Sequence, residues 1–190
     1  MKRFCCTFDV SDRTTILDIG GGHFNWELID QHPNVTMLNL KAQEASTQRP
    51  TRWVIGDARA LPFRDGAFDI AYSNSVIEHL GGIHSQLAFA AEVARVGRRF
   101  YVQTPNRRFP VEAHYLTPFL HYLPKSVQIR LVRNFTVWGI MLRPSKEQVR
   151  ELVQELRLLG RPELVQLFPT ANIISERVLW LHKSFIAIKA

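Results

Sequence analysis

The chain has 190 residues, of which 46% are hydrophobic and 22% are charged, with ten glycines and ten prolines. This composition excludes a disordered, collagen-like or coiled-coil protein. A chain of this length removes roughly 70% of its unfolded surface from water, so we expect residues 1–190 to form a single domain around one core. No apolar run approaches the roughly 20 residues that a membrane-spanning helix requires.

The two cysteines, Cys5 and Cys6, are neighbours in the sequence. Adjacent cysteines are poorly spaced for a disulfide or a zinc site. The sequence therefore predicts free thiols and a reducing, cytoplasmic location.

Positive charge is concentrated in one part of the chain. The formal net charge is +7, and residues 95–150 contain eleven Lys/Arg residues but only two acidic ones, Glu112 and Glu147. Such a concentration suggests an anionic partner, which could be a substrate, a membrane surface or a nucleic acid. A solvated basic face without a ligand is the alternative.

Short apolar and β-branched runs that end at turn residues predict strands, and apolar residues at helical spacing predict helices. In chain order we expect strands at 14–19, 35–40, 53–55, 68–72 and 100–102, followed by two later strands at 164–168 and 184–189. The expected helices lie at 23–31, 85–96 and 146–159. Ser145 is placed to cap the last of these helices.

This alternation of strands and helices predicts βαβ units. We therefore expect an α/β protein with a Rossmann-like, doubly wound and mostly parallel sheet, an antiparallel last strand, and helices on both faces. Ligands of such sheets bind beyond the carboxyl ends of the strands, near the point where the strand order reverses. The functional residues are expected just after the first five strands.

Three glycines, Gly20 to Gly22, follow the first predicted strand. Glycines at such a turn let the backbone approach a ligand closely and expose helix N–H groups. A dinucleotide fingerprint would also need glycine at position 25, which is Asn25, and the Gly-Lys-Ser/Thr of a P-loop is absent. A plain tight turn would use these glycines equally well.

The tripeptide Gly56-Asp57-Ala58 directly follows the third predicted strand. A carboxylate there can accept a hydrogen bond from an exocyclic amine while the adjacent N–H donates to a ring nitrogen, a combination that recognises adenine. A turn or cap role for Asp57 is the alternative.

Five motifs occur in a consistent order along the first half of the chain. They are Ile-Leu-Asp-Ile-Gly-Gly-Gly at 16–22, Gly-Asp-Ala at 56–58, Leu-Pro-Phe at 61–63, Phe-Asp-Ile at 68–70 and Val-Ile-Glu-His-Leu at 76–80. Together they resemble the class I S-adenosylmethionine-dependent methyltransferases, and among them the broad type-11 group. The resemblance covers about residues 14–106, and it implies S-adenosyl-L-methionine as the cofactor without indicating the methyl acceptor.

The resemblance also implies a cofactor site distributed along the chain. Its positions are Asp18, Gly20 and Gly22 at the methionine portion, Asn39 and Leu40 at the ribose, Asp57 and Ala58 at the adenine, and Ser73, Asn74 and Ser75 at the transferred methyl group. Two of the chain's residues depart from the family pattern. Phe24 replaces the third loop glycine and narrows the loop unless its ring turns into the core. Asn39 replaces the usual ribose-binding acid, so its hydrogen bonds are neutral and weaker.

Methyl transfer from a sulfonium is an in-line displacement, so the protein must supply alignment but no obligatory catalytic residue. We therefore assign no catalytic residue. Glu78-His79 occupies a region where some quinone-type O-methyltransferases bind a divalent metal, but the matching upstream acid is Ser75 here, and no metal is expected.

The segment after the fifth predicted strand lies at the expected mouth of the site. Arg107 could hold an anionic group of the substrate, and His114 has the pKa range of a general base. A structural or surface role is the alternative for both. Residues 107–143 form a basic and aromatic insertion that could act as a substrate lid, an interfacial helix or a packed helix.

We therefore expect methyl transfer to a small-molecule or lipid-like acceptor, with an anionic membrane surface as a further candidate partner. An RNA methyltransferase is the first alternative, favoured by the basic segment. Nucleic acid is the less expected partner, because the residues after the fourth predicted strand, Ser73-Asn74-Ser75-Val76, do not match the motif of enzymes that methylate the amines of nucleic-acid bases. The second alternative is a cofactor-binding subunit without catalysis of its own, which the departures at Phe24 and Asn39 keep open. The sequence does not indicate the oligomeric state.

Overall fold

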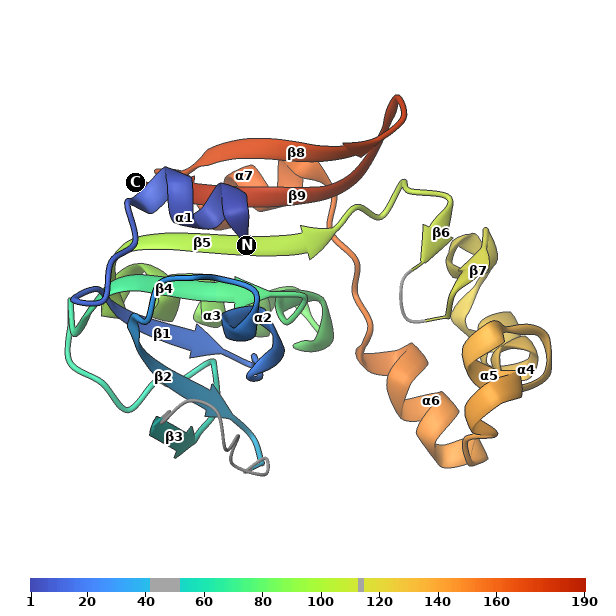
Figure 1. Cartoon of the computed structure of the whole chain (residues 1–190). Coiled ribbons are helices and arrows are strands. Elements are labelled where there is room, and N and C mark those ends of the chain that lie inside the picture. The colour runs from blue at the N-terminus through green and yellow to red at the C-terminus, as the bar shows by residue number, and fades with distance from the viewer. Residues whose placement is uncertain (42–51, 113–114) are drawn as a thin grey trace.

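A seven-stranded sheet forms the centre of the molecule (Figure 1). The computed structural model describes residues 1–41, 52–112 and 115–190. The strands are β1 (Thr15–Ile19), β2 (Asn34–Asn39), β3 (Arg52–Ile55), β4 (Phe68–Asn74), β5 (Gly97–Pro105), β8 (Asn172–Val178) and β9 (Leu181–Lys189). Their order is β3-β2-β1-β4-β5-β9-β8. The five strands from β3 to β5 are parallel, while β9 runs antiparallel to both β5 and β8.

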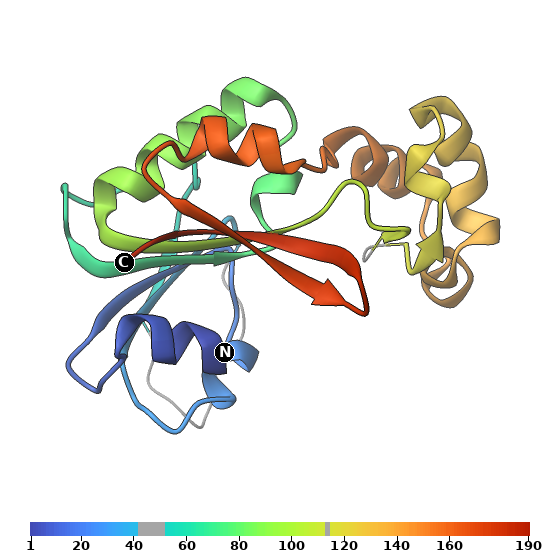
Figure 2. The same ribbon diagram turned by 90° about the horizontal axis from the view of Figure 1, so that it is seen from above.

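Helices cover both faces of the sheet (Figure 2). The helices α3 (Ile83–Val96) and α7 (Arg161–Leu167) lie on one face, and α1 (Lys2–Phe8) and the one-turn α2 (Phe24–Glu27) lie on the other. A 3-10 turn, η1 (Ile77–His79), connects β4 to α3. This arrangement confirms the Rossmann-like, mostly parallel sheet with an antiparallel edge.

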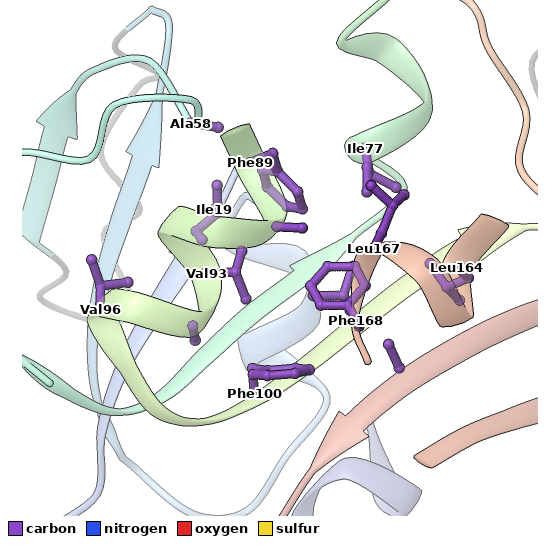
Figure 3. Close-up of a cluster of buried hydrophobic side chains, with 14 of the residues drawn as sticks. Ile19, Ala58, Ile77, Phe89, Val93, Val96, Phe100, Leu164, Leu167 and Phe168 are labelled. Carbon is purple, nitrogen blue, oxygen red and sulfur yellow. The ribbon is translucent and has the colours of Figure 1, made fainter. Parts of the chain in front are cut away.

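A buried apolar cluster on each face holds the helices against the sheet. Phe89 and Val93 of α3 point toward Phe100 of β5 and Phe168, which follows α7 (Figure 3). On the opposite face, the ring of Phe4 in α1 meets aromatic rings from α2, β4 and β5. These partners are Trp26, Tyr72 and Tyr101, with ring centroids between 5.0 and 6.0 Å from that of Phe4. Both clusters fix the strands whose carboxyl ends carry the candidate site.

Residues between β5 and α7 form a lobe beside the sheet (Figure 1). Its elements are β6 (Val111–Glu112), β7 (Thr117–Pro118), η2 (Leu120–Tyr122), α4 (Lys125–Phe135), α5 (Val137–Leu142) and α6 (Lys146–Glu155). The lobe has its own buried cluster, in which Val132 of α4 packs with Val149 and Val153 of α6. Helix α4 therefore packs on α6 rather than on the sheet, and the lobe continues beyond the 107–143 insertion expected from the sequence. Ser145 caps α6 as expected, because its Oγ accepts from the Gln148 N–H.

One expected strand is a helix, and one strand of the sheet was not expected. The strand expected at 164–168 is helix α7, because the Glu163 carboxylate accepts from the Gly160 N–H and fixes a helix start. The apolar residues of that segment then face the core at helical spacing. The sequence analysis also missed β8, which pairs with the last strand, β9.

The helix expected at 23–31 is only one turn long, and of its apolar residues Phe24, Leu28 and Ile29 only Ile29 is buried. Trp26 and Ile29 are buried, whereas Phe24 is 71% exposed and Leu28 is 57% exposed. The Phe24 ring thus lies in solvent at the start of α2 and does not turn into the core.

Within the described part of the chain, no helix is long and apolar enough to cross a membrane.

Candidate functional site

The main cleft lies at the carboxyl ends of β1, β2, β3 and β4, where the strand order reverses. Its volume is about 420 Å³, which falls in the range of roughly 300–1,000 Å³ that small-molecule sites occupy. Six of the ten residues that the resemblance implied at the cofactor line this cleft, namely Gly20, Asn39, Leu40, Asp57, Ala58 and Ser75. The other four, Asp18, Gly22, Ser73 and Asn74, are not among its lining residues.

Gly20 forms the floor of the cleft at the end of β1. Its φ of +75° lies in the left-handed region, and a Cβ at this position would lie 2.5 Å from Cγ2 of Val76. The Gly20 N–H donates to the Leu38 carbonyl, 2.7 Å away, which ties the loop to β2. Only glycine fits here without displacing Val76, which itself lines the cleft.

Asp18 lies beneath the glycine loop rather than in the cleft. Its side chain is fully buried, and Oδ2 accepts from Trp26 Nε1 at 2.7 Å. A Cβ on Gly21 would lie 2.1 Å from both carboxylate oxygens, so the loop backbone passes directly over them. Burial raises the pKa of Asp18 to about 7, against the lowering effect of the Trp26 hydrogen bond. Asp18 thus supports the loop from below.

Residues at the carboxyl ends of β2 and β3 form the opposite wall. The Gly56 N–H donates to the Asn39 carbonyl at 3.0 Å and holds these strand ends together. The Asp57 carboxylate pairs with the Arg59 guanidinium at 2.6 Å, and these hydrogen bonds lower the pKa of Asp57. Any ligand amine that approaches Asp57 must therefore share the carboxylate with Arg59, which also lines the cleft.

A second cavity, of about 240 Å³, adjoins the main cleft at Ser75. Ser75 lines both spaces and has a φ of +58°, with its N–H donating to the Gln103 carbonyl at 3.0 Å. A non-glycine residue in this conformation is strained, and such residues cluster at functional sites. Asn74 lines the second cavity, next to where the resemblance implied it.

His121, which the sequence analysis did not single out, also lines the second cavity. Its Nε2 lies 3.2 Å from the Arg107 carbonyl. A carbonyl can only accept, so Nε2 carries the proton and Nδ1 is left as an acceptor. Nδ1 is buried and has no hydrogen-bond partner among the described residues, and burial lowers the pKa of His121. The only signal for His121 in the sequence was that it is a second histidine close to His114.

Of the two predicted substrate residues, Arg107 lines neither the main cleft nor the second cavity. Arg107 lines a separate hollow beside the β8–β9 hairpin, where its guanidinium pairs with Glu163 at 3.2 Å. His114 lies outside the described residues. Glu155, the last residue of α6, lines the main cleft from the lobe, and no local sequence signal could have identified it.

Glu78 is a buried structural carboxylate rather than part of a visible metal site. Its Oε2 accepts from the Thr104 hydroxyl at 2.9 Å. In the ranges 1–41, 52–112 and 115–190, no three His, Cys, Asp or Glu side chains are grouped so that they could hold a metal ion.

Residues 17–99 match the model of the type-11 methyltransferase domain family. The chain is also 33% identical over 100 residues to the biotin biosynthesis bifunctional protein BioHC of Cellvibrio japonicus (strain Ueda107). That match covers 49% of this chain and 20% of the relative, so the chain spans only about a fifth of the curated protein.

Solved structures share the whole fold at low sequence identity. An S-adenosylmethionine-dependent methyltransferase from Methanosarcina mazei superposes with a TM-score of 0.57 at 16% identity, covering 97% of this chain and 95% of that one. The 1,6-didemethyltoxoflavin-N1-methyltransferase of Burkholderia thailandensis, solved with S-adenosylhomocysteine, gives a TM-score of 0.58 at 16% identity. Its coverage is 99% of this chain and 75% of that one.

Residues 17–99 therefore carry the sequence pattern of the type-11 methyltransferase domain, within a chain that has the class I fold of S-adenosylmethionine-dependent methyltransferase enzymes. S-adenosyl-L-methionine is the cofactor of this class. The main cleft fits that cofactor, because Gly20 leaves room where a side chain would intrude and Asp57 offers a carboxylate to an amine.

Proposed function

We propose that this chain transfers a methyl group from S-adenosylmethionine to a small-molecule or lipid-like acceptor bound in the second cavity. The observation that carries the proposal is the position of Ser75, which lines both the main cleft and the second cavity. A cofactor in one space and an acceptor in the other would meet at this residue. The bound cofactor supplies an electrophilic methyl group, and the chain supplies the alignment.

The second cavity favours a small acceptor or the small end of a larger one, because its volume is only about 240 Å³. Polar side chains such as Gln103 and Glu112 line it together with the apolar Phe109 and Leu158. This mixture suits an acceptor with both polar and apolar parts. The curated relative is named for biotin biosynthesis, which also favours a small molecule over RNA.

His121 is the residue we propose as proton acceptor. Its neutral imidazole keeps Nδ1 as an acceptor, because Nε2 donates to the Arg107 carbonyl. An acceptor hydroxyl or amine must lose a proton when it is methylated, and a neutral imidazole can take that proton near pH 7. A carboxylate acceptor would need no such base.

Methyl transfer to fractionated cell material tests the proposed function. The purified chain is incubated with methyl-labelled S-adenosylmethionine and with a small-molecule extract, a lipid extract or total RNA. We expect label in the small-molecule or lipid fraction, with less label for Asp57→Ala. Label in RNA alone would overturn the proposed acceptor class and support the RNA methyltransferase alternative.

We also propose a cytoplasmic location. Both Cys5 and Cys6 are free thiols in the structure, and a reducing compartment keeps thiols in this state. Fractionation of source cells with antibody detection would test this, and recovery of the chain in an oxidising compartment would contradict it.

A further inference from the structure

Helix α5 exposes an unusually apolar surface at the end of the molecule away from the sheet (Figure 1). We call this surface the α5 apolar face, and its members are Phe135, Val137, Ile140, Met141 and Leu142. Their exposed fractions range from 45% for Val137 to 75% for Met141. Single exposed apolar residues are ordinary, whereas a contiguous group of large ones marks an interaction surface.

The packing of α5 explains why these side chains point outward. The helix contacts α4 through Gly139, where a Cβ would lie 2.1 Å from the Val132 carbonyl oxygen. The N-terminal Thr136 is buried as well, with its hydroxyl donating to the same carbonyl at 2.6 Å. Trp138 packs against the buried cluster of the lobe. Close packing thus involves Thr136, Trp138 and Gly139, and the exposed apolar residues of α5 occupy its other four positions.

A second apolar segment lies beside the start of α5. The Val137 N–H donates to Thr117 Oγ1 at 3.3 Å, which places β7 next to the helix. The neighbouring residues Leu116 and Phe119 are 54% and 61% exposed, and both have positive φ values. Exposed apolar residues therefore continue from α5 onto this loop.

Positive charge lies next to the α5 apolar face, on α4 and directly after α5. From Tyr115 to Lys146 the sequence contains five Lys/Arg residues and no Asp or Glu. Arg130 and Arg133 lie on α4, and Arg143 directly follows α5; all three are exposed. Among the described residues, none of these three guanidinium groups forms an ion pair with a carboxylate.

We propose that the α5 apolar face docks onto an anionic lipid surface. Apolar side chains can enter the boundary between headgroups and acyl chains while arginines beside them attract anionic headgroups. A protein partner or a second copy of this chain could also cover apolar residues, but three exposed arginines without an ion pair among the described residues favour a surface dense in negative groups. This surface is distinct from the main cleft, to which the lobe contributes Glu155 of α6.

Vesicle co-sedimentation of the intact chain tests the proposal. The probes are phosphatidylcholine vesicles with and without phosphatidylserine, at about 0.1 M salt, where the Debye length is about 10 Å. We expect binding to the phosphatidylserine vesicles that falls as salt is added. Arg130→Gln with Arg133→Gln should weaken it about 25-fold, since each basic residue contributes about fivefold near such a surface. Ile140→Ser with Met141→Ser should weaken it by about tenfold or more.

Two control variants match these changes away from the lobe. Leu179→Ser alters an exposed leucine at the turn between β8 and β9, and Arg13→Gln alters an exposed arginine before β1. Both should bind vesicles like the parent chain, and all variants should bind S-adenosylhomocysteine like the parent, which reports an intact fold. Equal binding to both vesicle types, or no binding to either, would overturn the proposal. A dimer that Met141→Ser dissociates, without vesicle binding, would assign the face to a second copy instead.

Discussion

The Asp57 carboxylate combines two roles at the edge of the main cleft, because it is held by Arg59 and remains open to a ligand. Asp57→Ala removes the acceptor for the cofactor's amine. An unmade hydrogen bond of this kind costs about 1–3 kcal/mol, and we expect a loss at the low end because Arg59 already competes for the carboxylate. Titration calorimetry with S-adenosylhomocysteine measures the change. Glu151→Ala, an exposed acid on α6, is the control, and equal losses in both variants would argue against a ligand role for Asp57.

The buried Asp18 makes stability depend on pH. Burial raises its pKa to about 7 from the ordinary 3.8. Between these values the unfolded chain has lost the proton that the folded chain retains, so rising pH destabilises the fold across this window, and the full cost is reached above pH 7. The carboxamide in Asp18→Asn can still accept from Trp26 but cannot ionise.

We therefore expect the stability of Asp18→Asn relative to the parent chain to increase from pH 4 to pH 7, by about 4 kcal/mol at most. Urea unfolding at pH 4.5 and pH 8 measures this difference. A difference that is the same at both pH values would contradict the raised pKa.

Site residues next to strand ends were predictable, because strand patterns and glycine turns are local signals. Asn39, Asp57 and Ala58 line the main cleft for this reason. Residues brought in by tertiary packing were not predictable. Arg59 reaches the main cleft through its long side chain, and Glu155 lies on a helix about 100 residues further along the chain.

Gly139 is the contact point between helices α4 and α5. Gly139→Ala would place a methyl group 2.1 Å from the Val132 carbonyl and force the helices apart. Overpacking of this kind costs about 1–3 kcal/mol, and we expect faster hydrogen exchange in α4 and α5 with little change in the sheet. Gly82→Ala, where nothing lies within 4 Å of the added Cβ, is the matched control and should be within about 0.5 kcal/mol of the parent. Unchanged exchange in the lobe of Gly139→Ala would contradict this packing.

Elements were predictable where one pattern dominated. The five parallel strands and helices α3 and α6 have clear apolar periodicity, and the structure confirms them. Helix α7 was mistaken for a strand because its short apolar run fits both periods. The interaction that favours the helix is the hydrogen bond from the Gly160 N–H to the Glu163 carboxylate. In the sequence, this interaction is indicated only by the spacing of three residues between Gly160 and Glu163.

Arg157 connects the lobe to the sheet. Its N–H donates to the Glu78 carbonyl at 2.7 Å, and its guanidinium contacts Gln86 and Glu163. Arg157→Ala keeps the backbone hydrogen bond to Glu78 but removes the guanidinium that contacts the Gln86 and Glu163 side chains, at a cost of about 1–3 kcal/mol. We expect faster limited proteolysis around residues 156–160. Arg150→Ala, on the exposed side of α6, should be cleaved like the parent, and equal protection in both variants would contradict a linking role for Arg157.

The whole molecule combines a sheet that carries the main cleft, a second cavity closed by the lobe, and an apolar, basic surface at the far end of that lobe. The central claim is that the main cleft holds the methyl-donor cofactor. Titration of the intact chain with S-adenosylhomocysteine, followed by calorimetry and by amide chemical shifts, tests it most directly. The account predicts saturable one-to-one binding that S-adenosylmethionine competes with, and shifts centred on Gly20, Asn39 and Asp57. A folded chain that shows neither heat nor shifts at millimolar ligand, or shifts confined to other parts of the molecule, would contradict it.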